Sequence, residues 1–171
     1  DLPRVPAAPR PSALPRRVRV VLTKDDLKAL VVRARPAEEL SVDVETTGTD
    51  TIDSRLVGIA LAVEPGEGWY VPIGHRALGD PDQLPFEEVR AALTDLFIDP
   101  ALPKVGQNLK FDSQILTAAD LPLSPLTFDT LVGSYCLNPS RPNHGLKALA
   151  LDMLGEAMHQ SSIGIRCHAS C

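Results

Sequence analysis

Two carboxylates placed two residues apart, Asp43 and Glu45, are the first side chains in the sequence whose type and spacing could do chemistry. They end the largely apolar run Leu40–Glu45, which is typical of a β-strand. Because alternate side chains of a strand share a face, both carboxylates would lie with Ser41 on one side, and the apolar residues would face a core. Such a pair can bind one hard divalent cation. Charged pairs are also common on exposed strand faces, so the pair alone leaves both interpretations open.

A second set of polar residues follows in the segment Lys104–Asp112. Gly106 permits a tight passage from a strand into a helix. If the helix begins near Asn108, that residue and Asp112 stand four apart on one helical face and could act together. A structural interpretation is equally available, because Asn108 could cap the helix and Asp112 could be an acid favoured by the dipole of the first turn.

Together these segments resemble a known family. Asp43–Thr47 resembles the first motif, and Val105–Asp112 the second, of the 3′–5′ exonuclease (proofreading) domain of DNA polymerase I and other family A DNA polymerases. This domain is one of the four-carboxylate exonucleases, which include ribonuclease D. The segments Tyr70–His75, Phe128–Thr130 and Ser134–Asn138 are similar to the same family. The resemblance spans about residues 18–155, and its second motif is the most specific part.

The resemblance implies an α/β, ribonuclease H-like mixed sheet flanked by helices, and hydrolysis of the terminal phosphodiester of DNA with two divalent cations, Mg²⁺ or Mn²⁺. It implies that Asp43 bridges both ions, that Glu45 holds one, and that Asp112 holds the other. Thr46 and Asn108 would help to place the terminal nucleotide. The implied partners are a single-stranded DNA 3′ end and a polymerase domain of the parent protein. Two close cations can activate a water and stabilise the leaving 3′ oxygen.

The sequence departs from the family at the third motif, a Tyr followed four residues later by a metal-binding Asp. Neither Tyr70 nor Tyr135 has an Asp at that spacing. The spacing of the related His-type motif does occur in His75 and Asp80, but these residues precede the second motif. Asp129 is a possible substitute, although its counterpart in the family is structural. The resemblance therefore implies a domain that ends before its final helices.

Three functional hypotheses follow: a DNA exonuclease domain, an RNA-trimming exonuclease of the ribonuclease D type, and a non-catalytic module that keeps the fold. With one carboxylate of four missing from these 171 residues, we expect slow cleavage at best. In the family the third motif's helix packs on the sheet and on the second motif's helix. Its absence predicts an exposed apolar surface that includes Ile115 and Leu116, and hence marginal stability or self-association.

Periodicity and turn residues predict the elements that must position these groups. Strands are expected at residues 17–22, 40–45, 56–63 and 69–73, with a hairpin turn at 64–68 and a short apolar piece at 103–106. Helices are expected from the Thr23 cap to Pro36 and at 85–97, 109–119, 130–137 and 146–154. The last helix should bury Leu146, Leu149, Ala150, Met153 and Leu154 on one face. Cys136 is expected in the core, and Trp69 and Tyr70 are expected to pack.

Charge is unevenly distributed along the chain. Residues 1–35 hold nine Lys and Arg against three Asp and Glu, a net of +6, and the remainder holds eight against nineteen, a net of −11. An acidic body is a poor general binder of duplex DNA. It suits an enzyme whose carboxylates hold divalent cations, because the ions reverse the local charge.

Composition and the positions of the Pro-rich and atypical segments suggest one globular domain between two atypical ends. Apolar residues make up 44% and charged residues 23%, which are ordinary globular values. We expect a Pro/Arg-rich lead-in at 1–16, the exonuclease domain at 17–158 and an atypical tail at 159–171. No run approaches the length of a membrane span, and the lead-in lacks a signal peptide's apolar region. Three cysteines make no disulfide framework, so a cytoplasmic location is the default expectation.

Overall fold

Six strands form one mixed sheet, in the order β1-β4-β3-β2-β5-β6. The computed structural model describes residues 17–76, 82–155 and 157 of the chain. The strands are β1 (Arg17–Val20), β2 (Leu40–Thr46), β3 (Leu56–Glu64), β4 (Glu67–Pro72), β5 (Lys104–Gly106) and β6 (Leu126–Asp129). The central strands β2, β3 and β4 are antiparallel, whereas β1, β5 and β6 each run parallel to their neighbours. The expected α/β architecture with a mixed sheet is confirmed.

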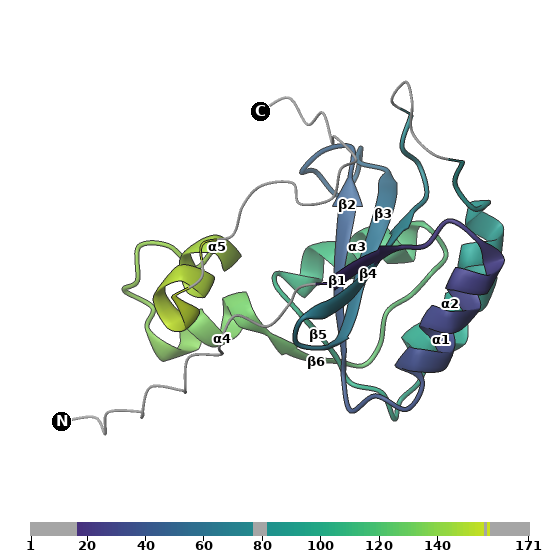
Figure 1. Cartoon of the computed structure of the whole chain (residues 1–171). Coiled ribbons are helices and arrows are strands. Elements are labelled where there is room, and N and C mark those ends of the chain that lie inside the picture. The colour runs from purple at the N-terminus through teal and green to yellow at the C-terminus, as the bar shows by residue number, and fades with distance from the viewer. Residues whose placement is uncertain (1–16, 77–81, 156, 158–171) are drawn as a thin grey trace.

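Three helices cover one face of this sheet (Figure 1). They are α1 (Lys24–Ala34), α2 (Phe86–Ile98) and α3 (Leu109–Ala118). Their buried side chains form one cluster with the apolar residues of the sheet, which include Leu40, Val42, Val44, Ile59, Leu61, Trp69 and Val71. The remaining elements, α4 (Thr130–Leu137), α5 (Leu146–Leu149) and the π-helical turn η1 (Ala150–Leu154), follow β6. They project from that edge on the side away from α1 and α2 (Figure 1).

Local sequence explains where the first helix and the hairpin begin. Thr23 caps α1 in a reciprocal box: its hydroxyl accepts from the Asp26 N–H at 3.1 Å, and the Asp26 carboxylate accepts from the Thr23 N–H at 3.1 Å. The turn between β3 and β4 contains Gly66 with φ at +88°, a backbone conformation that glycine adopts at no steric cost. The sequence predicted the Thr23 cap and the hairpin turn, but not the reciprocal bond to Asp26.

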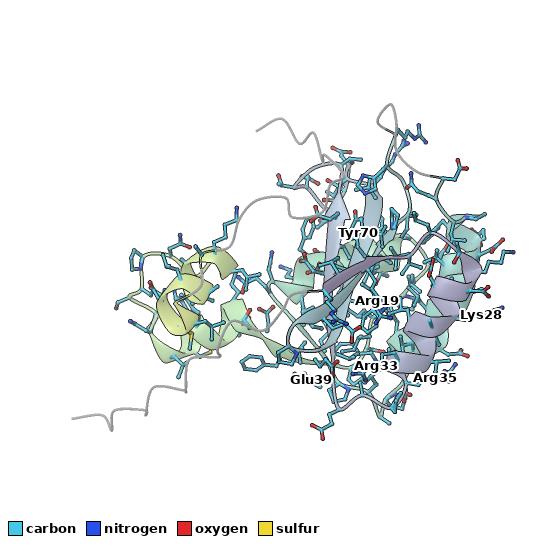
Figure 2. The ribbon with its side chains drawn as sticks, in the orientation of Figure 1. Arg19, Lys28, Arg33, Arg35, Glu39 and Tyr70 are labelled. Carbon is cyan, nitrogen blue, oxygen red and sulfur yellow. The ribbon has the colours of Figure 1, made fainter. Side chains whose placement is uncertain are left out.

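Basic side chains of the described N-terminal region gather on β1 and α1, where Arg19, Lys28, Arg33 and Arg35 are seen in Figure 2. Arg19 contacts Glu67 at 2.9 Å, and Arg33 contacts Glu64 at 2.6 Å. These acidic partners offset part of the positive charge that the sequence concentrates here.

The surface left uncovered differs from the one predicted. Ile115 and Leu116 are 2% and 0% exposed, because α3 turns both side chains into the core beneath β2. The expectation that they are exposed is therefore wrong. The exposed apolar surface lies instead on the elements beyond β6. Helix α4 has no buried residue, and its Val132, Tyr135 and Leu137 are exposed.

Two further expectations for this C-terminal part fail. In the last helical segment only Leu149 and Ala150 are buried, whereas Leu146, Met153 and Leu154 are exposed, because no other described element covers that side. Cys136 is exposed and not in the core. We call the segment Thr130–Leu154 the arm.

Strand β6 was not predicted, because its four residues are too few to show a period of two. The expected segments at 1–16 and 159–171 lie outside the described residues, as does Asp80. Within the described part of the chain, no helix is long and apolar enough to cross a membrane.

Candidate active site

Asp43 and Glu45 lie on β2 with their side chains on the face opposite the core, as strand parity predicted. The burial of β2 alternates, with Leu40, Val42 and Val44 buried and both carboxylates exposed. Across the antiparallel pair, Asp43 is opposite Ala60 and Glu45 is opposite Gly58. The register shifts directly after Glu45. The two carboxylates therefore stand at the point where β2 leaves the regular sheet.

Asp112 reaches this strand from the first turn of α3. It is 3% exposed, and its Oδ1 accepts a hydrogen bond of 2.9 Å from the N–H of Val44, the residue between the two carboxylates. This N–H is free to bind a side chain because β5 pairs with β2 only at Leu40 and Ser41. The sequence-predicted residues Asp43, Glu45 and Asp112 are thus brought to one stretch of β2.

Gly106 allows this close approach. A Cβ at this position would lie 2.7 Å from the carbonyl oxygen of Val42 and 2.6 Å from Leu109 Cδ2. Only a residue without a side chain fits between β2 and the start of α3. The sequence signal for this requirement was the glycine itself, at the expected passage from strand to helix.

The carboxylates repel one another. Loss of hydration raises the pKa of Asp43 to about 7, although its side chain still reaches solvent, and the negative charges of Asp112 and Glu45 raise it further. Burial raises the pKa of Asp112 to about 6, with a further contribution from the charge of Asp129. The Val44 N–H opposes that rise, because it stabilises the charged form.

This donor set fits a hard divalent cation in its chemistry, because carboxylate oxygens are the ligands that Mg²⁺ and Mn²⁺ prefer. A cation would also relieve the repulsion that raises the pKa of Asp43. Among the described side chains, however, no three His, Cys, Asp or Glu groups converge closely enough to hold an ion as they stand. Cation binding therefore requires at least one of the exposed carboxylates to turn toward the others.

The two residues expected to place a nucleotide lie at the ends of the same elements. Thr46 closes β2, and its hydroxyl donates to the carbonyl oxygen of Gly48 at 2.5 Å. Asn108 precedes α3 with φ at +60°, and its exposed side chain makes no capping hydrogen bond. The simple interpretation of Asn108 as a side-chain cap is therefore wrong.

Asp129 performs the capping instead. Its carboxylate accepts from the N–H groups of Asn108 at 3.0 Å and Leu109 at 2.8 Å, at the start of α3. It also accepts from Leu131 at 2.9 Å and Val132 at 3.4 Å, at the start of α4. With both oxygens committed to four backbone donors, Asp129 is structural, which the family resemblance implied.

Sequence reasoning gave Tyr70 no role beyond packing. It is 2% exposed and lies on the same face of the sheet as Asp43, since both are paired with Ala60. Asp43 and Tyr70 line one hollow of about 200 Å³, whose floor includes Ser41 and Ala62. Only the cross-strand register reveals this proximity.

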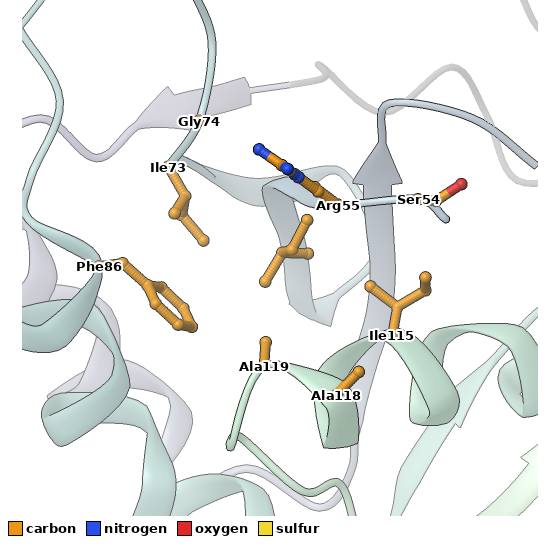
Figure 3. Close-up of a pocket in the computed structure, with 9 residues that line it drawn as sticks. Ser54, Arg55, Ile73, Gly74, Phe86, Ile115, Ala118 and Ala119 are labelled. Carbon is orange, nitrogen blue, oxygen red and sulfur yellow. The ribbon is translucent and has the colours of Figure 1, made fainter. Parts of the chain in front are cut away.

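A separate cleft of about 300 Å³ lies on the helix-covered side, between the start of α2, the end of α3 and the strand ends. Figure 3 shows Ile73, Phe86, Ile115 and Ala119 pointing into it. None of the described residues that line this cleft is a carboxylate, so we do not include it in the candidate metal site.

Comparison with known families shows to which family the chain belongs. A family model described as 3′-5′ exonuclease, of the kind found in family A DNA polymerases, matches residues 18–167. The chain belongs to this exonuclease family. The match covers both segments that supply the candidate carboxylates.

Curated relatives agree with this family. The exonuclease chain is 36% identical over 140 residues to DNA polymerase I of Pseudomonas aeruginosa, and 37% identical over 141 residues to that of Chloroflexus aurantiacus. These matches cover 81% and 82% of the chain but only 15% and 14% of the two relatives. The chain thus spans about a seventh of the length of these proteins.

Solved structures share the ribonuclease H-like fold, which confirms the fold expectation. The polymerase part of Pol1 from M. smegmatis in complex with DNA primer-template and dNTP has a TM-score of 0.67 at 22% identity, over 82% of this chain and 23% of that one. Brucella melitensis NrnC with bound Mg²⁺ gives 0.63 at 18%, over 86% and 66%. Escherichia coli RNase D, an exoribonuclease, gives 0.62 at 20%, over 85% and 35%.

Proposed function

We propose that this chain carries part of the catalytic site of a DNA 3′–5′ exonuclease, with Asp43, Glu45 and Asp112 as its cation ligands. The observation that carries the proposal is the hydrogen bond of Asp112 to the Val44 N–H, which holds a third carboxylate beside the strand that bears the other two. The relationship to DNA polymerase I favours DNA as the substrate and a polymerase domain as the partner in the parent protein.

Two divalent cations, Mg²⁺ or Mn²⁺, would supply the activation of an attacking water and the stabilisation of the leaving 3′ oxygen. Asp43 would hold both ions, and Glu45 and Asp112 would each help to hold one of them. Thr46 and Asn108, at the adjoining ends of β2 and α3, would orient the terminal nucleotide. The bound Mg²⁺ in the NrnC structure, which shares the fold, supports the choice of cation.

The test is release of nucleotides from 3′-labelled single-stranded DNA, with Mg²⁺ or Mn²⁺, by the chain and by D43N. We expect slow, metal-dependent cleavage, because these residues lack a Tyr-x-x-x-Asp motif. D43N should lower the rate about a hundredfold or more, a typical loss for removing a metal-positioning group. D95N is the matched control, because Asp95 is an exposed acid on α2. Equal rates for the chain and D43N would contradict the proposal.

The same assay with an RNA substrate tests the second candidate function. The fold is shared with E. coli RNase D, an exoribonuclease. Faster degradation of a single-stranded RNA than of DNA of the same sequence would replace DNA by RNA as the substrate.

A further inference from the structure

Tyr70 occupies the space that a side chain at position 58 would fill. A Cβ built on Gly58 would lie 2.0 Å from the phenolic oxygen of Tyr70 and 2.5 Å from Cζ. Tyr70 belongs to β4 and lies on the sheet (Figure 2), and its ring extends along the strand from Ala60 to Gly58. Gly58 is the residue directly opposite Glu45 in β2. The end of the Tyr70 ring therefore lies over the residue that is paired with Glu45.

The position of the Tyr70 hydroxyl is itself fixed. It forms a hydrogen bond of 2.5 Å with Nε2 of His75, and the two rings are tilted at 58°. The backbone of His75 is held in turn by the Gln83 side-chain amide, which accepts from the His75 N–H at 3.0 Å and donates to the His75 carbonyl oxygen at 2.8 Å. A continuous set of contacts thus runs from Gln83, which precedes α2, through His75 and Tyr70 to Gly58 of β3. Gly58 is paired in turn with Glu45 of β2.

We propose that Tyr70 and His75 are positioning residues of the carboxylate site, which hold Glu45 beside Asp43 through the contact of the Tyr70 ring with Gly58. The inference rests on the proposed function, because it names further residues of that same site. Tyr70 is only 2% exposed, so we infer that it acts on the site through its neighbours. Groups that orient metal ligands in this way typically change metal affinity about tenfold to a hundredfold when they are removed.

The experiment compares Mn²⁺ affinity by electron paramagnetic resonance, well below the unfolding midpoint, in the chain and four variants. Y70F removes the bond to His75, H75A removes its partner, and H75Q keeps a polar group near the Nε2 position. Y135F is the matched control, because Tyr135 is the other tyrosine of the chain and lies exposed on the arm. We expect Mn²⁺ to bind about tenfold more weakly to Y70F and H75A, and nearly normally to H75Q and Y135F.

A purely structural role for Tyr70 gives a different result. It would lower the thermal midpoint of Y70F and leave its Mn²⁺ affinity unchanged, and that outcome overturns the proposal. G58A alters the contact between Tyr70 and Gly58 at the glycine, because its new methyl group must displace the Tyr70 ring. We expect G58A to weaken Mn²⁺ binding as Y70F does.

Nuclear magnetic resonance of the metal-free chain separates this inference from the proposed function. The backbone amide and side-chain carboxyl signals of Glu45 should move in Y70F and H75A and return in H75Q. If the unaltered chain binds no Mn²⁺ but these signals behave as expected, the proposed function fails and the positioning role stands. If the Glu45 signals of Y70F match those of the unaltered chain, the positioning role is refuted.

Discussion

At the scale of single residues, Asp43 and Asp112 are carboxylic acids that the fold keeps partly dehydrated and close to other negative charges. Their pKa values, about 7 and about 6, lie above the ordinary value of 3.8. In the folded state they therefore hold protons over a pH range in which the unfolded chain has already released them. Stability from this source is present below about pH 4 and is lost as pH rises through the folded-state values.

The direction of these two pKa shifts predicts how thermal stability depends on pH. Without divalent cations, the thermal midpoint of the chain should fall as pH rises from about 5 to about 8. D43N should show a smaller fall, because its amide cannot ionise, and D95N should follow the unaltered chain. Calorimetry in the presence of a chelator measures all three. Parallel curves for D43N and the unaltered chain would mean that Asp43 has no raised pKa in the folded state.

At the scale of elements, the junction of β5 with α3 decides where Asp112 lies. Gly106 lies between the Val42 carbonyl oxygen of β2 and the Leu109 side chain at the start of α3, with no room for a Cβ. Asp129 accepts the first N–H groups of α3 and so fixes its start from the side of β6. The geometry of the candidate site is thus set by contacts between the elements that carry it and not only by the carboxylates themselves.

G106A tests this junction. The added methyl group would overlap Leu109 and the Val42 carbonyl, so we expect a loss of about 1–3 kcal/mol in the free energy of unfolding. G68A is the matched control within the same sheet, because its Cβ would meet only the Leu61 carbonyl oxygen at 3.6 Å, an ordinary contact. Urea denaturation compares the two variants. A loss for G106A no greater than that for G68A would show that α3 is not held closely against β2.

Sequence reasoning succeeded where a short local pattern determines the outcome. The parity of β2 placed Asp43 and Glu45 on one face, and Thr23 as an N-cap marked the start of α1. It failed where burial depends on distant partners. The contact of Tyr70 with Gly58 follows from cross-strand register, which no single segment encodes. Cys136 lies in an apolar helix, but helical periodicity does not say whether another element covers it.

At the scale of the whole molecule, two parts differ in how they bury apolar side chains. One is the sheet with helices α1, α2 and α3, which we call the body, and the other is the arm. The body has one continuous core beneath the sheet. The arm leaves Val132, Tyr135, Leu151 and Met153 between 53% and 65% exposed. Large apolar side chains exposed together on one projecting segment favour association.

We therefore expect the isolated chain to associate as its concentration rises, in sedimentation velocity measurements. The double variant L151E/M153E should reduce this association, because it places charge on the exposed side of η1. V32E is the matched control, because Val32 is 71% exposed on α1, away from the arm. A chain that stays monomeric throughout, or an equal effect of both variants, would argue against the arm as the associating surface.

The proposed function requires Asp43, Glu45 and Asp112 to hold divalent cations. The most direct test is a crystal of this chain soaked in Mn²⁺, with the ions located by their anomalous scattering. Cation binding by these residues predicts a peak on the open face of β2, with carboxylate oxygens of Asp43 and at least one of the other two at about 2.1 Å, and no such peak in D43N crystals. Mn²⁺ found only at other surface acids, with the three carboxylates turned apart, would contradict it.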